Sequence, residues 1–184
     1  MRLRAESSAL LVVDWQDKLC KAMPPEAEAR GRKNVGILIE AARLLGVPVV
    51  VSEQYPQGLG RTLPDVWALA EAAAAQRVEK VTFACTNDSA FQALATALGP
   101  RSWVVSGMES HVCVWQTVRG LLEIAPFVHV VADAVLSRAE ENRAIGVGLC
   151  REAGATVTST ETVAFDWLGK AGSDAFKAIS RLVR

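Results

Sequence analysis

The sequence predicts an α/β protein with three layers, in which a six-stranded parallel sheet lies between two layers of helices. Six short segments rich in β-branched residues alternate with longer segments of helical periodicity. Five of the six show little polar alternation, which is typical of strands that are buried on both faces. The length of 184 residues suits a single domain, residues 1–184, with one sizeable core.

The predicted strands are Ala9–Val13, Val47–Val51, Arg77–Val81, Trp103–Val105 with its flanks, Val128–Ala132 and Ala155–Thr158. In open parallel sheets, ligands bind beyond the carboxyl ends of the strands, where the strand order reverses. Residues that directly follow strands are therefore the candidates for a functional site. They are Asp14, Ser52–Tyr55, Gly107–Cys113 and Asp133.

Boundary signals place helices between these strands. Val35, Leu38 and Leu45 follow helical spacing, and Gly46 with Pro48 ends that helix. Two capping boxes are predicted, one from Ser89 to Gln92 and one from Ser137 to Glu140. Further apolar stripes of helical spacing are Leu94 with Leu98, Val114 with Val118, Leu121 and Leu122, and Phe176 with Ile179 and Leu182.

Composition and missing motifs exclude several functions. Twenty basic and twenty acidic residues balance, so nothing favours nucleic acid or an anionic membrane as a partner. No apolar run approaches the roughly 18 residues that cross a bilayer, and we expect a cytoplasmic protein. The near-neutral, apolar-rich composition favours a homo-oligomer. The fingerprints GxGxxG, GxxxxGK[ST] and GxSxG are absent, and we predict no cofactor.

Cys113 stands out among the four cysteines by its position. It follows the fourth strand at the expected start of a helix, where the helix dipole and free N–H groups favour negative charge. We therefore expect a lowered thiol pKa, and a nucleophile with an oxyanion hole beside it. The alternative is a small buried hydrophobic residue. Cys20, Cys85 and Cys150 are interpreted as packing residues, although Cys85 lies near Lys80 in the sequence.

Two charged residues could complete such a site. Asp14 ends an apolar strand and is a candidate general base, although a helix cap or an ion pair would explain it equally. Lys80 could stabilise a thiolate and orient the carboxylate, although most lysines are solvated. Candidates for lining the pocket are Trp15, Gln54, Tyr55, Phe83 and His111. For each of these, packing or a structural role is the alternative.

These motifs together resemble the isochorismatase-like cysteine hydrolase superfamily. Asp14 in LLVVDWQDKL, Lys80 in KVTF and Cys113 in GMESHVCV match its triad, and the similarity runs from about Ala9 to Val163. The segment EQYPQGLG, residues 53–60, looks closer to the isochorismatase-domain-containing branch.

The resemblance implies the strand order 3-2-1-4-5-6, a cis peptide bond between Met108 and Glu109, and an oxyanion hole formed by the N–H groups of Glu109 and Cys113. It also implies an oligomer and a small-molecule substrate. True isochorismatases generally lack the cysteine, and nicotinamidases use histidine metal ligands that are absent between Asp14 and Lys80. We therefore predict a metal-free hydrolase of a small amide, ureide or similar carbonyl compound. The alternative is a non-catalytic binding module.

Overall fold

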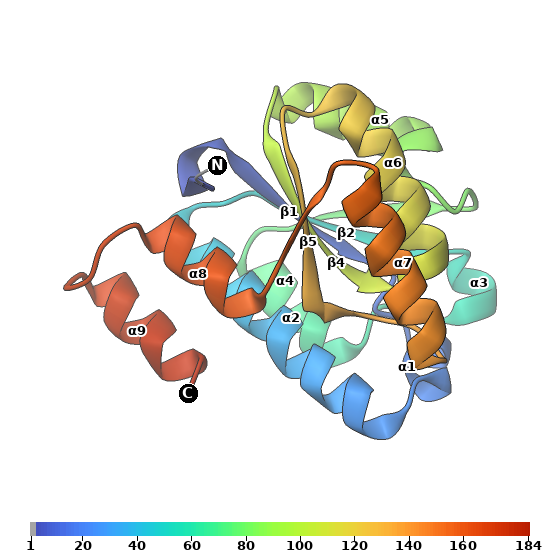
Figure 1. Ribbon diagram of the computed structural model, residues 1–184, viewed down its shortest axis with the longest axis horizontal. Helices are drawn as coiled ribbons and strands as arrows, with labels where there is room; N and C mark the ends of the chain where they lie inside the picture. Colours follow the sequence, from blue (N-terminus) through green and yellow to red (C-terminus); the bar gives the residue numbers. More distant parts are fainter. Residues whose placement is uncertain (1–2) are drawn as a thin grey trace.

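The computed structural model describes residues 3–184. Figure 1 shows one twisted sheet with helices on both sides. The strand order is β3-β2-β1-β4-β5-β6, and every neighbouring pair is parallel. This confirms both the predicted fold class and the predicted strand order. The order reverses at β1, which lies between β2 and β4 at the middle of the sheet.

The strands are β1 (Ser8–Val13), β2 (Val49–Gln54), β3 (Gln76–Lys80), β4 (Ser102–Met108), β5 (Val128–Leu136) and β6 (Thr156–Thr158). All six predicted strands are present. The structure extends β2, β4 and β5 beyond the predicted carboxyl ends, because the residues there still pair in the sheet, and in β2 these residues are polar. These extensions carry several side chains of the candidate site.

The helices are α1 (Asp17–Ala22), α2 (Pro25–Leu45), α3 (Pro56–Leu59), α4 (Pro64–Ala72), α5 (Ser89–Leu98), α6 (Trp115–Ile124), α7 (Glu140–Glu152), α8 (Thr160–Leu168) and α9 (Asp174–Leu182). Three tight turns also occur, η1 (Ala5–Ser7), η2 (Cys85–Asn87) and the π-helical turn η3 (Ser110–Val114). Helices α2, α4 and α8 cover one face of the sheet and α5, α6 and α7 cover the other, while α9 packs on α2 (Figure 1).

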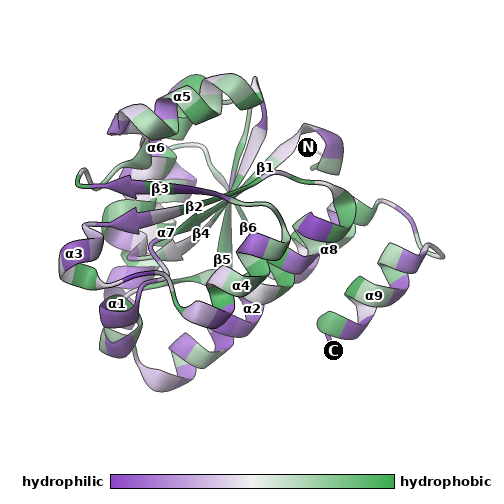
Figure 2. Ribbon diagram, turned by 180° about the vertical axis from the view of Figure 1, so that it is seen from behind, coloured by the Kyte–Doolittle hydropathy of each residue, from purple (hydrophilic) through white to green (hydrophobic). Residues whose placement is uncertain are grey.

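Each face of the sheet has its own apolar core. Alternate residues of β1 supply both, with Leu10 and Val12 on the α2 side and Leu11 and Val13 on the α6 side. Burying one such side chain contributes about 1.5–3 kcal/mol. Figure 2 shows apolar central strands, whereas β3 and the end of β2 are hydrophilic. Polar side chains therefore gather at one corner of the carboxyl edge.

The structure corrects the two predicted helix caps. The N-cap of α5 is Asp88, whose carboxylate accepts hydrogen bonds from the N–H groups of Ala90 and Phe91. Ser89 is the first helical residue. The helix α7 begins after Ala139 without a side-chain cap. Ser137 instead faces the loop of residues 109–114, which contains the predicted nucleophile Cys113 and is called the nucleophile loop below. Its hydroxyl is used in a tertiary contact there.

Asp133 does not follow a strand, contrary to the prediction. It lies inside β5, which is longer than predicted and shifts register against β4 in this region. Its carboxylate accepts hydrogen bonds from the N–H and the hydroxyl of Thr160 at 2.8 and 2.9 Å. Asp133 therefore anchors the start of α8. No helix within residues 3–184 is long and apolar enough to cross a membrane.

Candidate active site

The sheet register brings the three predicted catalytic residues to one corner of the carboxyl edge. Asp14 directly follows β1, Cys113 lies in η3 after β4, and Lys80 is the last residue of β3. Strands β1 and β4 flank the point where the strand order reverses. Open parallel sheets bind their ligands at this point.

Asp14 turns the chain sharply out of β1. Its φ angle of 54° lies in the left-handed region that few residues other than glycine adopt. Backbone bonds hold the turn, since the N–H of Asp14 donates to the Ser52 carbonyl at 3.1 Å and the N–H of Gln16 donates to the Asp14 carbonyl at 2.8 Å. The Ser52 hydroxyl donates to Asp14 Oδ1 at 2.6 Å. The fully buried carboxylate is thus held from its own backbone and from β2.

Lys80 reaches Asp14 across the intervening strand β2. Neighbouring strands are about 4.8 Å apart, so β3 lies about 10 Å from β1, and a long side chain is needed. Lys80 Nζ donates to Asp14 Oδ2 at 2.9 Å and to Gln54 Oε1 at 2.8 Å, and neither side chain of the Lys80–Asp14 ion pair is exposed. Burial disfavours the ammonium charge, but the negative charge of Asp14 and the hydrogen bond to its carboxylate act in the opposite direction, and the Lys80 pKa is raised.

Close packing determines where Cys113 lies. A Cβ at Gly107 would lie 2.0 Å from the Val13 carbonyl oxygen, so only glycine allows β4 to approach β1 here. On the other side, a Cβ at Gly146 would lie 2.5 Å from the Ser110 carbonyl carbon, so α7 packs directly on η3. The N–H group of Val114 donates to the Glu109 carbonyl at 3.1 Å. The nucleophile loop is therefore tightly held.

The thiol of Cys113 has a raised pKa, the opposite of what its position in the sequence predicts. Burial is the largest cause, and the negative charge of Asp14 and a hydrogen bond with that carboxylate add to it, while Lys80 acts in the opposite direction. Loss of solvent around Cys113, which is only 6% exposed, thus disfavours the thiolate. The resting site holds a neutral thiol beside an Asp14–Lys80 ion pair.

Cys85 is a second thiol in the same cluster. It is fully buried, and its N–H donates to Thr117 Oγ1 at 2.9 Å. Burial raises its pKa. The other two cysteines lie elsewhere, and burial raises the pKa of each to about 12. All four are free thiols.

The nucleophile loop has further polar anchors. The peptide bond between Met108 and Glu109 is cis. Among the described residues, no backbone carbonyl accepts the N–H of Glu109. The Glu109 carboxylate accepts from the N–H and the guanidinium of Arg138 at 3.2 and 3.1 Å. Ser137 bonds with Ser110 and, at 3.0 Å, with His111 Nδ1, so His111 is held in a loop contact.

The candidates for lining the pocket separate into different roles. Trp15 was predicted wrongly, because it is fully buried in the core on the opposite, α2 side of the sheet. Gln54 is 8% exposed and binds Lys80 directly. Tyr55 and Phe83 follow β2 and β3 and are each 53% exposed, so both can border the opening of the site.

Two buried polar residues of β2 lie in the segment Ser52–Tyr55 that the sequence marked for inspection, but no individual role was predicted for them. Ser52 binds Asp14, as described above, and Glu53 anchors the segment that follows β2. Glu53 Oε1 accepts from the N–H and the hydroxyl of Thr62 at 2.8 Å each, and Oε2 accepts from Arg61 at 2.8 Å. Alternation along the strand was an available signal, because Ser52 and Gln54 share one face and Glu53 takes the other.

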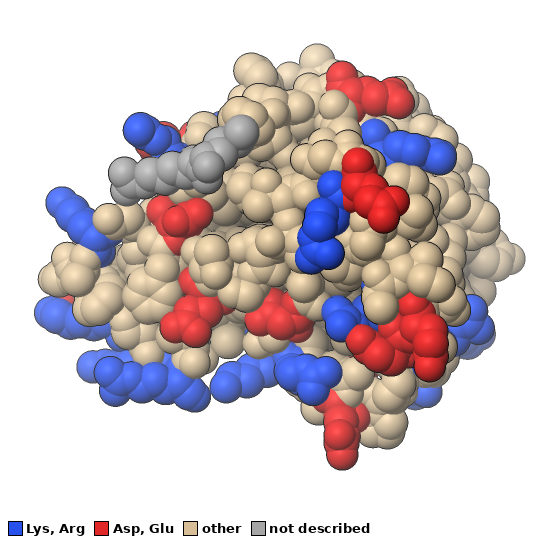
Figure 3. Space-filling view, in the orientation of Figure 1, with Lys and Arg blue, Asp and Glu red and all other residues tan. Residues whose placement is uncertain are grey.

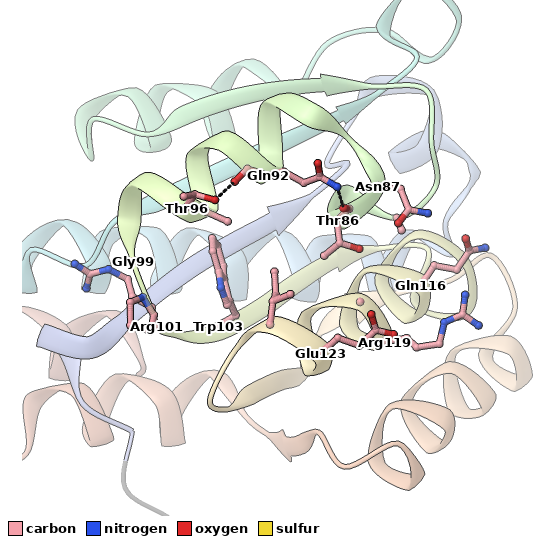
Figure 4. A pocket seen from close by; sticks show the side chains of 15 residues that line it. Thr86, Asn87, Gln92, Thr96, Gly99, Arg101, Trp103, Gln116, Arg119 and Glu123 are labelled. Carbon is pink, nitrogen blue, oxygen red and sulfur yellow. Dashed lines mark hydrogen bonds between the residues drawn. The ribbon is translucent and has the colours of Figure 1, made fainter.

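A cavity of about 730 Å³ lies away from this cluster, between α5 and α6 (Figure 4). Its lining includes Thr86, Gln92, Trp103 and Arg119, and none of the three predicted catalytic residues. Within residues 3–184, no group of three or more histidine, cysteine or acidic side chains is arranged to hold a metal ion.

Comparisons with known proteins show the family and agree with this fold. The isochorismatase domain model matches residues 8–162, and the chain belongs to the isochorismatase family of hydrolases. The secreted isochorismatase effector Isc1 of Phytophthora sojae is 36% identical over 188 residues, covering 100% of this chain and 87% of that protein. Isochorismatase domain-containing protein 2 of Xenopus laevis is 31% identical, covering 99% of this chain and 86% of that protein.

Solved structures show the same architecture. The structure of the MAR1 ribonuclease from Caenorhabditis elegans has a TM-score of 0.89 and 32% identity, covering 100% of this chain and 92% of that chain. The YcaC gene product of Escherichia coli, described as an octameric hydrolase of unknown specificity, has a TM-score of 0.84 and 22% identity, covering 92% of this chain and 83% of that chain. These structural likenesses show the fold, and the family is shown by the domain model and the two curated relatives.

Proposed function

We propose that this protein is a cysteine-dependent hydrolase of a small amide, ureide or similar compound, acting through a thioacyl intermediate on Cys113. The observation that carries the proposal is a buried ion pair, Asp14 with Lys80, in contact with a thiol. A buried ion pair costs several kcal/mol in desolvation per ion and is weak evidence for stability alone. The ion pair lies beside a thiol at the point where the strand order reverses, and this position favours a chemical role.

In the first step, Asp14 accepts the thiol proton while the Cys113 sulfur attacks the carbonyl carbon of the substrate. The resting thiol is neutral, so proton transfer accompanies the attack and no thiolate is needed beforehand. Lys80 stays protonated and offsets the negative charge that passes from the carboxylate to the sulfur and on to the substrate oxygen.

The tetrahedral oxyanion is held by backbone donors in the nucleophile loop. We assign this role to the N–H groups of Glu109 and Cys113, and the absence of a backbone acceptor for the Glu109 N–H among the described residues supports the assignment. Loss of one such donor typically costs about 10²–10³-fold in rate.

In the second half, the C–N bond breaks and Asp14 returns its proton to the leaving nitrogen. A water molecule then enters, gives a proton to Asp14, and attacks the thioester carbonyl carbon. The C–S bond breaks and the sulfur recovers the proton from Asp14, so the acid product leaves and the resting site is restored. One carboxylate thus serves as base and acid in turn.

The experiment that tests this proposal is a screen of small amides, ureides and esters with the intact chain and with Cys113→Ala. We expect turnover of at least one class and its loss in Cys113→Ala with the circular dichroism spectrum unchanged. Cys150→Ala is the matched control, because Cys150 is a fully buried thiol on α7 outside the cluster. Full activity in Cys113→Ala would reject the mechanism, and inactivity of the intact chain on every class would favour a binding module.

A short single-stranded RNA belongs in the same screen, because one solved relative is named as a ribonuclease. The chain has a net charge of zero, and Figure 3 shows basic and acidic side chains interspersed on the face it displays. Binding to a polyanion needs a concentration of basic side chains. We therefore expect no RNA cleavage that depends on Cys113.

We also propose that the chain works as a homo-oligomer in the cytoplasm. The octameric YcaC neighbour and several half-exposed apolar side chains, including Tyr55, Phe83 and Ile124, support association. Four free thiols are compatible with a reducing compartment. Light scattering of the purified chain tests the first part, and fractionation of cells that express it tests the second.

A further inference from the structure

Gln54 occupies a position that neither the sequence nor the triad explains. It is the last residue of β2 and pairs in register with Lys80, the last residue of β3. Its amide lies 8% exposed between the ammonium group and the chain after Lys80. It therefore cannot act mainly as a wall of an open pocket, and its contacts point to a different role.

The orientation of the Gln54 amide is determined by its two partners. Nε2 donates to the Val81 carbonyl at 2.8 Å, and Oε1 accepts from Lys80 Nζ at 2.8 Å. The reversed amide would place an NH₂ group against the ammonium and an oxygen against a carbonyl, so that both contacts would be repulsive. The carbonyl oxygen of Gln54 is thus committed to Lys80.

The backbone of Gln54 is held just as firmly. Its N–H donates to Gln16 Oε1 at 2.7 Å, and Gln16 Nε2 donates back to the Gln54 carbonyl at 3.0 Å and to the Gly60 carbonyl at 2.6 Å. These bonds use the backbone of Gln54 and the side chain of Gln16. A substitution of the Gln54 side chain therefore leaves them in place, which allows the role of the amide to be tested alone.

We propose that Gln54 is a positioning residue that acts through Lys80, an inference that rests on the proposed function of the triad. The ammonium has three N–H groups, of which one binds Asp14 and one binds Gln54, and the third has no hydrogen-bond acceptor among the described residues. With two N–H groups held, the ammonium cannot rotate, and the third keeps one direction available to the reacting groups.

The chemistry of an amide suits this role better than that of a carboxylate. A neutral oxygen satisfies a buried N–H without cancelling the positive charge, so the charge of Lys80 stays available to the sulfur and to the substrate oxygen. A second carboxylate at this place would compete with the thiol for that charge. The positive field at Cys113 therefore depends on a neutral acceptor at position 54.

The test measures alkylation of Cys113 by iodoacetamide as a function of pH, resolved by mass spectrometry, in the full chain and in Gln54→Met, Lys80→Met and the double variant. Removal of the positive charge in Lys80→Met disfavours the thiolate and should slow alkylation by about tenfold or more at a given pH. Gln54→Met should slow it by about tenfold in the native background and cause no further loss when Lys80 is already absent.

A matched control is Gln92→Met, because Gln92 also donates its amide to a backbone carbonyl but lies on α5. We expect its alkylation profile to match that of the native chain. An unchanged or faster reaction in Gln54→Met would overturn the inference, as would equal slowing with and without Lys80, which marks a purely structural effect. Unchanged alkylation in Lys80→Met would instead contradict the proposed triad itself.

If Lys80→Met does not fold, Gln54→Glu decides the matter. A glutamate keeps an acceptor for the ammonium and adds a negative charge beside it, so the midpoint of the alkylation profile should move to higher pH by about one unit. A profile identical to that of the native chain would overturn the inference.

Discussion

Two fully buried carboxylates lie near the ends of neighbouring strands, and they differ in how completely they are satisfied. Glu53 is surrounded by donors from Thr62 and Arg61, with Arg77 at 3.8 Å. Asp14 receives one hydroxyl from Ser52 and one N–H from Lys80, on the opposite face of the sheet. Asp14 also acts on the Cys113 thiol, whose pKa it raises.

The difference separates an anchoring carboxylate from the carboxylate that we propose as the general base. Burial acts against the charge of Glu53, but hydrogen bonds from Thr62 and Arg61 and the charge of Arg77 together lower its pKa. Three hydrogen bonds and the ion pair with Arg77 hold Glu53, whose carboxylate anchors the segment that follows β2. Asp14 keeps an acceptor position for a proton that can move.

The largest effect is expected for the carboxylate of Asp14. Asp14→Asn removes the proposed base, and turnover of the substrate found in the screen should fall by about 10²–10⁴-fold. Alkylation of Cys113 should become faster at a given pH, because the charge that raises the thiol pKa is gone. Steady-state kinetics and pH-dependent alkylation measure the two effects, and slower alkylation with retained turnover would contradict the assignment.

The second effect concerns the anchoring carboxylate. Glu53→Gln loses charge-assisted hydrogen bonds to Arg61 and Thr62, and the free energy of unfolding should fall by about 2 kcal/mol. Glu79→Gln is the matched control, because Glu79 contacts the same Arg61 but is 44% exposed. Glu79→Gln should lower the free energy of unfolding by less than about 1 kcal/mol. Denaturant titration measures both, and equal costs would remove the distinction between the two sites.

Acid should weaken the same anchor. The folded pKa of Glu53 lies below its unfolded value of about 4.3, so its contribution is fully present above that pH. The contribution is lost as the pH falls through the folded pKa. The difference in unfolding free energy between the native chain and Glu53→Gln should therefore narrow below about pH 4.3. A difference that stays constant down to pH 3 would contradict the lowered pKa.

The smallest expected effect concerns the Ser52 hydroxyl, which donates a hydrogen bond to Asp14. Ser52→Ala removes a hydrogen bond to a buried carboxylate and should cost about 1 kcal/mol in stability and reduce turnover. Ser106→Ala is the matched control, because Ser106 is a fully buried serine on β4 whose hydroxyl has no hydrogen-bond partner among the described residues. Its removal should be neutral. Thermal unfolding and kinetics on both variants would show whether Ser52 behaves differently.

Much of the fold was predictable because its strands are short apolar runs covered on both faces. The requirement for apolar residues also made the predicted strands too short. Strand β2, for example, continues through Ser52, Glu53 and Gln54, which are polar and buried. The helix α8 was missed because its N-cap, Ser159, is followed three residues later by Thr162, and a capping box needs glutamate or glutamine there.

Asp14 and Cys113 were candidates because they follow predicted strands, whereas Lys80 lay inside the predicted strand Arg77–Val81 and was added by its charge and by the family resemblance. Their electrostatic state was not predictable. The helix start predicted a lowered pKa for Cys113, whereas burial and the charge of Asp14 raise it. Local sequence shows which groups are near a helix end, but it does not show how much water reaches them.

The sequence by itself determined the parallel sheet, the order of its layers and the three residues to inspect, because periodicity and strand ends are local properties. Only the tertiary structure decided that Trp15 packs in the opposite core, that Gln54 holds Lys80, and that the thiol is neutral. Those outcomes depend on register between strands and on exclusion of solvent. Both arise from contacts between residues far apart in the chain, and no local pattern encodes them.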